Sequence, residues 1–321
     1  MHADKYVPSR REGTLGITTS RPSRRSLITL GAGSALAAAL PLASRASAST
    51  QSAGMGSITR QLRELERQHA ARLGVFAHHT VTGLTVRYRA DERFPLCSLF
   101  KTLAGAAVLR DLDNNGEFLA QRIRYTEQDV TSSGYAPITG KPENLANGMT
   151  VSQLCEATIC YSDNAAGNLL LRELHGPTAI TRFCRSIGDP LTRLDRWEPD
   201  LNSAEPWRTT DTTSPRAIGQ TYQRLVLGNA LPSDDRTQLT NWLLANTTSG
   251  EKFRAGLPSD WTIADKTGGG GYGTNHDVGI TWPPGQPPIV LAVLTTKREP
   301  DASPDNPLVA RAAALVAATL T

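Results

Sequence analysis

The 321-residue sequence lacks the patterns that mark metal sites and nucleic-acid-binding proteins. Its four cysteines form no Cys-x-x-Cys pair and it contains no His-x-His-x-Asp cluster, so the ligand spacings typical of zinc are missing. Beyond residue 48 it has 27 basic and 28 acidic side chains, so no strongly basic face is implied. We therefore expect no metal, no other cofactor and no nucleic-acid partner.

The sequence also lacks an apolar run long enough for an ordinary membrane span. Its longest candidate covers residues 27–42, about 16 moderately apolar residues. The twin-arginine pair Arg24 and Arg25 precedes this run, and Ala46-Ser47-Ala48 supplies the small residues that a signal peptidase requires. A membrane anchor is the alternative. We expect residues 1–48 to be a cleaved twin-arginine signal peptide and the mature protein to be secreted or periplasmic, without a stable membrane anchor.

The few cysteines of an exported chain raise the question of disulfides. They are Cys97, Cys155, Cys160 and Cys184. An even number in such a protein is compatible with pairing. Cys155 and Cys160, however, are five residues apart on an expected helix, and that separation does not suit a bridge within it. We favour four buried free thiols.

Apolar spacing near residue 60 predicts a helix followed by a hairpin. The apolar stripe of the helix consists of Ile58, Leu62, Leu65 and Leu73. Gly74 would end this helix. Residues 75–77 and 84–88 then predict two strands joined around Thr82-Gly83.

The rest of the chain predicts an α/β protein of the α+β type. Strand patterns return at residues 261–265, 278–282 and 289–295, before a last helix at 307–320. Strands from both ends of the chain would form one five-stranded antiparallel sheet flanked by helices.

We expect residues 49–321 to be a single catalytic domain with two lobes. The α/β lobe would comprise about 57–96 and 247–321, and an all-helical lobe about 97–246. Clefts between lobes are common ligand sites, so we expect the active site there.

Ser98 and Lys101 provide the first chemical signal. Three residues apart on a helix, they share a face, so the hydroxyl and the ammonium can meet. A serine becomes a good nucleophile when a base takes its proton, and a lysine with a lowered pKa could be that base. The buried helix expected at residues 102–109 would aim backbone N–H groups at the serine. Ser249 and Lys252 have the same spacing, so a chance surface pair is the alternative.

Three further segments carry side chains suited to catalysis. Tyr161-Ser162-Asp163-Asn164 interrupts two helical stretches, Lys266-Thr267-Gly268 follows the strand at 261–265, and Glu198 lies in a polar loop that closes at Asp211. Each has an ordinary interpretation as a turn, a strand end or a loop. The four segments in this order favour a catalytic site.

The ordered set resembles the class A active-site serine β-lactamases over about residues 57–320. The resemblance implies that Ser98 attacks the β-lactam carbonyl and becomes acylated. The N–H groups of Ser98 and Gly269 would form the oxyanion hole. Ser162 would relay a proton to the leaving nitrogen, with Lys101 and Lys266 setting its electrostatics.

The resemblance also assigns the second half of the reaction. Glu198, with Asn202, would fix a water molecule and act as the general base that hydrolyses the acyl-enzyme. Whether Lys101 or Glu198 is the base during acylation stays open. A salt bridge between Arg196 and Asp211 would tie the ends of this loop, and the Glu198–Pro199 peptide bond is a cis candidate.

The implied substrate is a small β-lactam molecule. Asn164 would bind its side-chain amide, Lys266 and Thr267 its carboxylate, and Tyr135 would lie at the mouth of the site. From the habit of the family we expect a monomer.

The carboxylate site departs from the family pattern. Many relatives place an arginine at the position of Asn275, and others supply it from the position of Lys252. We expect Lys252 to be the carboxylate partner here, although lysine lacks the bidentate fork of arginine. A solvated surface lysine is the alternative.

Two other functions share much of this pattern. A D-alanyl-D-alanine carboxypeptidase has the same nucleophile, Ser-x-Asn turn and Lys-Thr-Gly strand, but lacks a base like Glu198. A non-catalytic penicillin-binding receptor would need a transmembrane segment or an attached domain, and neither is visible in the sequence. The segment Glu198-Pro199-Asp200-Leu201-Asn202 favours the hydrolase.

Overall fold

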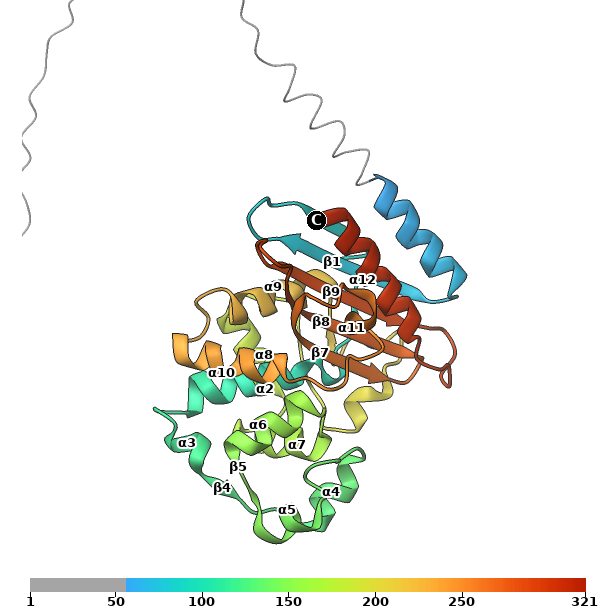
Figure 1. Ribbon diagram of the computed structural model, residues 1–321. Helices are drawn as coiled ribbons and strands as arrows, with labels where there is room; N and C mark the ends of the chain where they lie inside the picture. The colour runs from blue at the N-terminus through green and yellow to red at the C-terminus, as the bar shows by residue number, and fades with distance from the viewer. Residues whose placement is uncertain (1–55) are drawn as a thin grey trace, which may run out of the picture. The chain divides into compact units, whose positions relative to one another are not determined.

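The computed structural model describes residues 56–321, which lie within one compact unit (Figure 1). The expected signal peptide, residues 1–48, lies outside the described residues. Within residues 56–321, no helix has the length and apolar character needed to cross a membrane. All four cysteines are buried and free, as predicted.

A five-stranded antiparallel sheet built from both ends of the chain forms the upper part of the molecule in Figure 1, as predicted. Its strand order is β2-β1-β9-β8-β7, so β2 and β7 are the edges. The strands are β1 (Arg72–His79), β2 (Thr85–Tyr88), β7 (Thr262–Gly270), β8 (Thr274–Trp282) and β9 (Ile289–Thr296). The hairpin of β1 and β2 pairs Val75 with Tyr88, which confirms the predicted connection around Gly83.

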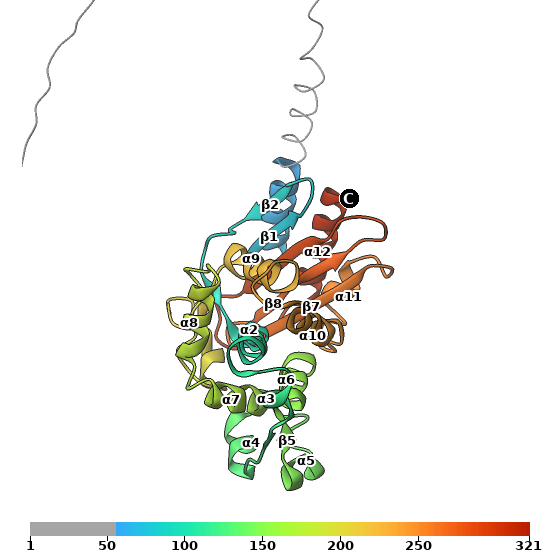
Figure 2. The same cartoon turned by 90° about the vertical axis from the view of Figure 1, so that its left-hand side faces the viewer.

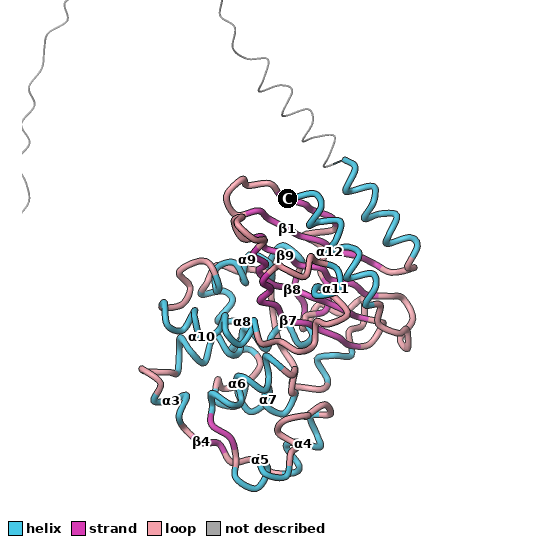
Figure 3. The backbone as a smooth tube through the Cα atoms, viewed as in Figure 1, coloured by secondary structure: helices cyan, strands magenta, loops and turns pink. Residues whose placement is uncertain are grey.

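Helices dominate the lower part of the molecule (Figure 3). Apart from α9 (Pro215–Val226) and α12 (Asn306–Leu320), which lie against the sheet, the longer helices are α2 (Phe100–Ala107), α6 (Val151–Cys160), α7 (Asn164–Glu173), α8 (Thr178–Ser186) and α10 (Ser233–Leu244). The short ones are α3 (Glu117–Ala120), α4 (Glu127–Ser133), α5 (Pro142–Asn147), α11 (Phe253–Gly256), the 3₁₀ turns η1 (Cys97–Leu99) and η3 (Asp200–Ser203), and the π-helical turn η2 (Val108–Leu112). Two small ribbons pair β3 (Phe94–Pro95) with β6 (Thr212–Thr213) and β4 (Arg122–Ile123) with β5 (Met149–Thr150).

Alternate residues of the sheet enter two separate cores, because successive side chains of a strand point to opposite faces. Leu291 and Val293 pack with α12 and with the helix at residues 56–68. Val290 and Ala292 pack with α9 and the helical part of the chain. Figure 2 shows α12 and α9 on opposite sides of the sheet. The second core continues into α2, which carries Lys101, so the sheet and the helical region share one hydrophobic interior.

The prediction for Leu73 and Gly74 was wrong. The first helix ends at residue 68, and both residues lie in β1, where Leu73 pairs with Thr295. Leu73 fits the helical period only because it lies eight residues after Leu65, a coincidence that spacing cannot detect. A Cβ atom on Gly74 would lie 2.6 Å from the ring of Phe94, so close packing requires this glycine.

The predicted end of β7 was also wrong. The strand runs through Lys266 and Thr267 to Gly270, which pairs with Thr274. Glycines within a strand often mark the close approach of another chain segment. A Cβ on Gly268 would lie 3.3 Å from Leu99 in η1, and one on Gly270 would lie 2.6 Å from the carbonyl oxygen of Asn202 in η3. The glycines thus let η1 and η3 approach β7.

The close packing of α11 on α12 allows a prediction about the free energy of unfolding. A Cβ on Gly256 would lie 2.1 Å from the carbonyl oxygen of Ala310, whereas one on Gly250 would meet nothing within 4 Å. We expect Gly256→Ala to lower the free energy of unfolding by about 1–3 kcal/mol, because backbone atoms must move. Gly250→Ala is the matched control and should leave it near the wild-type value. Equal denaturation midpoints for the two variants would contradict this packing.

Candidate active site

Ser98 lies in η1, directly before α2, and is 7% exposed. The residue before it, Cys97, has φ +45°, a left-handed conformation that costs a non-glycine residue of order 1 kcal/mol or more. Such conformations persist only where the surroundings enforce them. In the structure η1 packs against β7 and η3, so Ser98 lies in a segment held by both.

Lys101 is fully buried, and its ammonium contacts oxygen atoms from two other segments. Nζ donates to the carbonyl oxygen of Ser162 at 2.8 Å and to Asn164 Oδ1 at 2.6 Å. It lies 3.1 Å from Glu198 Oε1, and both side chains of this ion pair are fully buried. A buried charge is tolerated only with such partners.

The predicted contact of Lys101 with Ser98 is not among the hydrogen bonds of residues 56–321. The ammonium instead engages the acceptors of Ser162, Asn164 and Glu198. A carboxylate and two carbonyl oxygens are stronger acceptors than a neutral hydroxyl, which explains this preference.

The Ser162 hydroxyl lies between two lysines. Its Oγ is 3.0 Å from Lys266 Nζ and 3.4 Å from Lys101 Nζ. Lys266 is fully buried and also donates to the Thr267 carbonyl oxygen. Burial, followed by the positive charges of Lys101 and Lys252, lowers the pKa of Lys266 well below its usual value. The hydroxyl therefore has a nitrogen on either side with which it can exchange a proton.

Asp163 organises the turn that carries Ser162 and Asn164. Its fully buried carboxylate caps α7 at the Ala166 N–H and accepts hydrogen bonds from the backbone N–H groups of Ile138 and Thr139. These bonds hold the segment around residue 135 beside the turn.

Asn164 and Tyr135 meet at this turn. The backbone N–H of Asn164 donates to the Tyr135 carbonyl oxygen, and its Nδ2 donates to the Ser133 carbonyl oxygen. The side-chain amide of Asn164 thus keeps one N–H beyond its contacts with Lys101 and Ser133. Tyr135 is 59% exposed.

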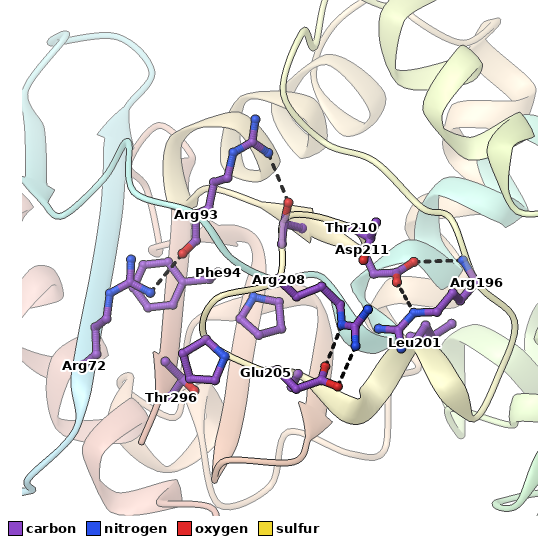
Figure 4. Close-up of a pocket in the computed structure, with 14 residues that line it drawn as sticks. Arg72, Arg93, Phe94, Arg196, Leu201, Glu205, Arg208, Thr210, Asp211 and Thr296 are labelled. Carbon is purple, nitrogen blue, oxygen red and sulfur yellow. Dashed lines mark hydrogen bonds and ion pairs between the residues drawn. The ribbon is translucent and has the colours of Figure 1, made fainter. Parts of the chain in front are cut away.

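The loop at residues 196–211 carries Glu198 and is tied at both ends. Arg196 Nε donates to Asp211 Oδ2 at 2.6 Å, which confirms the predicted salt bridge, and the Glu198–Pro199 peptide bond is cis, as expected. Behind the loop lies a cavity of about 30 Å³, large enough for about one water molecule (Figure 4). The cavity is lined in part by the Arg196–Asp211 and Arg208–Glu205 ion pairs, which are formed within this loop.

Glu198 is held at its backbone and at both carboxylate oxygens. Asn168, on α7, accepts from the Glu198 N–H and donates to its carbonyl oxygen. Oε1 faces Lys101, and Oε2 accepts a hydrogen bond from Asn202 Nδ2. Asn202 Oδ1 is buried and has no hydrogen-bond partner among the described residues. A buried acceptor beside a carboxylate is suited to holding a water molecule.

The remaining predicted residues come from β7 and β8 and, for Lys252, from the turn directly before α11. Thr267 Oγ1 lies 2.5 Å from Thr248 Oγ1. Burial lowers the pKa of the half-buried Lys252, against the opposing effects of Asp277, Asp265 and Glu251.

Asn275 and Gly269 lie opposite each other on β8 and β7. Asn275 donates to Asn306 on α12, so its side chain is engaged there. Gly269 is near the end of the edge strand β7, where alternate backbone N–H groups are free of strand pairing.

The structure brings most of the predicted residues into one hydrogen-bonded cluster. Its members are Lys101, Ser162, Asn164, Glu198, Asn202, Lys266 and Thr267. Ser98, Gly269, Tyr135 and Lys252 lie on the segments around it without a side-chain hydrogen bond to these residues within the part of the chain that the structure describes.

Sequence reasoning missed Asn168 and His276. Asn168 was detectable, because asparagine is a poor helix former and it lies four residues after Asn164, on the same face of α7. His276, a buried histidine in β8, had no motif around it.

Comparison with known proteins identifies the family. A model described as the β-lactamase enzyme family matches residues 57–320. A β-lactamase of Streptomyces lavendulae is 65% identical over 306 residues, covering 95% of this chain and all of that protein. The β-lactamase of Streptomyces albus G is 63% identical over 310 residues, covering 94% and 99%.

Solved structures agree. The Streptomyces albus G β-lactamase structure superposes with a TM-score of 0.82 at 66% identity, covering 83% of this chain and all of that one. A β-lactamase structure from Desulfarculus baarsii gives 0.79 at 43% identity, covering 82% and 97%. The chain therefore belongs to the β-lactamase enzyme family and is a serine β-lactamase.

Proposed function

We propose that this chain hydrolyses the β-lactam ring through an acyl-enzyme on Ser98, and that Glu198 activates the water that releases it. The observation that carries the proposal is the fully buried Lys101, whose ammonium contacts both Ser162 and Glu198. One charge thereby links the residues assigned to ring opening with the residue assigned to hydrolysis.

In the acylation step, Ser98 Oγ bonds to the lactam carbonyl carbon and the carbon–nitrogen bond of the ring breaks. The Ser98 proton passes to a base, either Lys101 or Glu198. Ser162 then gives its proton to the leaving nitrogen and is reprotonated from a neighbouring lysine, which its position between Lys101 and Lys266 supports. The N–H groups of Ser98 and Gly269 would stabilise the oxyanion.

In the deacylation step, Glu198 takes a proton from water while the water oxygen attacks the ester carbonyl carbon. The bond between the ester carbonyl carbon and Ser98 Oγ then breaks, and Glu198 returns the proton to Ser98. The unpartnered Asn202 Oδ1 and the carboxylate of Glu198 are acceptors for that water molecule. The clamp from Asn168 fixes the backbone of Glu198, so the carboxylate is preorganised.

The buried cations suit an anionic substrate. Lys266 and Thr267 would bind the substrate carboxylate, and the free N–H of Asn164 its side-chain amide, with Tyr135 at the mouth. The position of Glu198 favours the hydrolase over a D-alanyl-D-alanine carboxypeptidase. Glu198 is held beside Lys101, and Asn202 Oδ1 next to it can accept a hydrogen bond from water.

Removing Glu198 should separate the two steps. We expect Glu198→Ala to accumulate one penicilloyl group on the peptide containing Ser98, measured by mass spectrometry after mixing with benzylpenicillin. The adduct should persist at least a hundredfold longer than in the wild type, because general-base catalysis contributes about 10²–10⁴ in rate.

Asp200→Ala is the matched control, because Asp200 is a carboxylate in the same loop and its side chain is exposed. It should turn over without a lasting adduct. A stable adduct on the wild type would assign the chain to the peptidase or receptor class. The absence of any adduct or turnover in all three proteins would refute the proposed function.

Lys252 is the proposed partner of the substrate carboxylate. We expect Lys252→Ala to raise the KM for benzylpenicillin about tenfold, since a hydrogen bond to a charged group contributes about 1.5–3 kcal/mol. Lys252→Arg should restore it, and Lys141→Ala, at an exposed lysine, should leave it unchanged. An unchanged KM in Lys252→Ala would exclude the assignment.

We further propose that the chain is exported by the twin-arginine route, acts outside the cytoplasm as a monomer and has no nucleic-acid partner. The twin-arginine pair, the short apolar run and Ala46-Ser47-Ala48 support the export signal. The balanced charge beyond residue 48 supports the absence of a nucleic-acid partner. A secreted protein that still begins before residue 40 would argue against cleavage at residue 48.

A further inference from the structure

His276 is a fully buried imidazole on β8 that no step of the proposed mechanism uses. Its Nδ1 is 3.1 Å from the backbone nitrogen of Thr295, and its Nε2 is 2.9 Å from the carbonyl oxygen of Pro95. A backbone N–H only donates and a carbonyl oxygen only accepts, so the partners define the tautomer. Nδ1 is the acceptor, and Nε2 carries the hydrogen and donates it to Pro95.

The ring is held in its neutral form. Burial lowers the pKa of His276 to about 4, and the positive charge of Lys252 acts in the same direction, whereas the hydrogen bond to Pro95 opposes it. At neutral pH the imidazole therefore keeps one donor and one acceptor, and each has a partner. Within the sheet the ring is a fixed spacer between β9 and β3.

Its acceptor, Pro95, lies three residues before Ser98. The same peptide group is also held on its other side, because the Leu96 N–H donates to the Asp211 carbonyl oxygen at 2.7 Å. Cys97, with φ +45°, follows directly. The left-handed conformation of Cys97 would relax without such restraints. The hydrogen bonds to the Pro95 carbonyl oxygen and from the Leu96 N–H therefore help to enforce the conformation that presents Ser98.

The same ring contacts the strand that carries Gly269. A Cβ on Gly268 would lie 3.4 Å from His276 Cδ2, 3.3 Å from Leu99 Cγ and 3.5 Å from Cys97 Cβ. The imidazole, β7 and η1 therefore meet at this glycine. Ser98 lies in η1 and Gly269 in β7.

We propose that His276 is a positioning residue for the nucleophile: its Nε2–H bond to Pro95 fixes the backbone of residues 95–98 against β7. This arrangement would let the N–H groups of Ser98 and Gly269 bind the same substrate oxygen. The inference rests on the proposed function, since it assigns these two groups to the oxyanion hole.

Two amide substitutions form a matched pair for the test. In His276→Gln the terminal nitrogen reaches the position of Nε2 and can still donate to Pro95. In His276→Asn the shorter side chain can accept from Thr295 at the position of Nδ1 but cannot reach Pro95. Both keep a polar amide at the same buried site, and each keeps one of the two bonds of the ring: His276→Gln the bond to Pro95, and His276→Asn the bond to Thr295.

We expect His276→Asn to lower kcat and kcat/KM for benzylpenicillin together, by about tenfold or more, with little change in KM. That pattern marks the loss of an interaction made in the transition state. His276→Gln should stay within about threefold of the wild type. Equal kinetics for the two variants, or a loss in KM alone, would overturn the proposal.

An infrared measurement tests the oxyanion hole directly. In the Glu198→Ala background, the ester carbonyl stretch of the Ser98 adduct should move to higher frequency with His276→Asn and stay in place with His276→Gln. An unmoved band in both variants would overturn the proposal. If Glu198→Ala forms no adduct on Ser98, the proposed function fails instead, so the two failures are distinct.

If His276→Asn does not fold, nitrogen NMR of histidine-labelled Glu198→Ala protein provides the test. The Nε2–H resonance of His276 should shift when benzylpenicillin acylates Ser98. A resonance that acylation leaves unmoved would overturn the proposal.

Discussion

The active site is organised by the need to satisfy one buried charge, the ammonium of Lys101. Its side chain has no exposure to water, and the cost of such burial is several kcal/mol unless oxygen atoms replace the lost solvation. Those oxygens come from the turn at Ser162 and Asn164 and from Glu198 in the loop at residues 196–211. Segments about 60 and 100 residues away in the sequence are thereby drawn onto α2. Ser162, Asn164 and Glu198 thus replace the water that Lys101 loses on burial, and further members of the cluster bind to these residues.

Lys266 adds a second buried nitrogen and gives the site its electrostatic character. Burial and the nearby charges of Lys101 and Lys252 lower its pKa. Two lysines close to one serine hydroxyl repel each other, and Glu198 offsets this beside Lys101. The substrate carboxylate and the oxyanion would add further negative charge there. The left-handed backbone of Cys97 and the closeness of Lys101 and Lys266 both lower the stability of the folded state. Both occur at the site of the proposed chemistry.

The sequence predicted the sheet and most of the cluster because both leave local patterns. A continuous apolar run marks β9, which is buried on both faces, and Ser162, Asp163 and Asn164 stand together in one short turn. Leu73 was misassigned because its spacing from Leu65 fits a helix by coincidence. The strand β7 was predicted to end at residue 265, but it continues into its glycines, which let η1 and η3 approach it closely. Lys101 was expected to contact Ser98, but its preference for charged and carbonyl oxygens is decided by tertiary contacts. Asn168 and His276 act through backbone groups distant in sequence, and no local pattern encodes those.

The most direct test of this account is rapid-quench mass spectrometry of Lys101→Ala with benzylpenicillin. If one ammonium serves both halves of the reaction, the variant should form the Ser98 adduct more slowly than the wild type. Once formed, the adduct should also disappear more slowly, because Glu198 has lost its ion pair. Formation and loss of the adduct at wild-type rates would contradict the central role of Lys101.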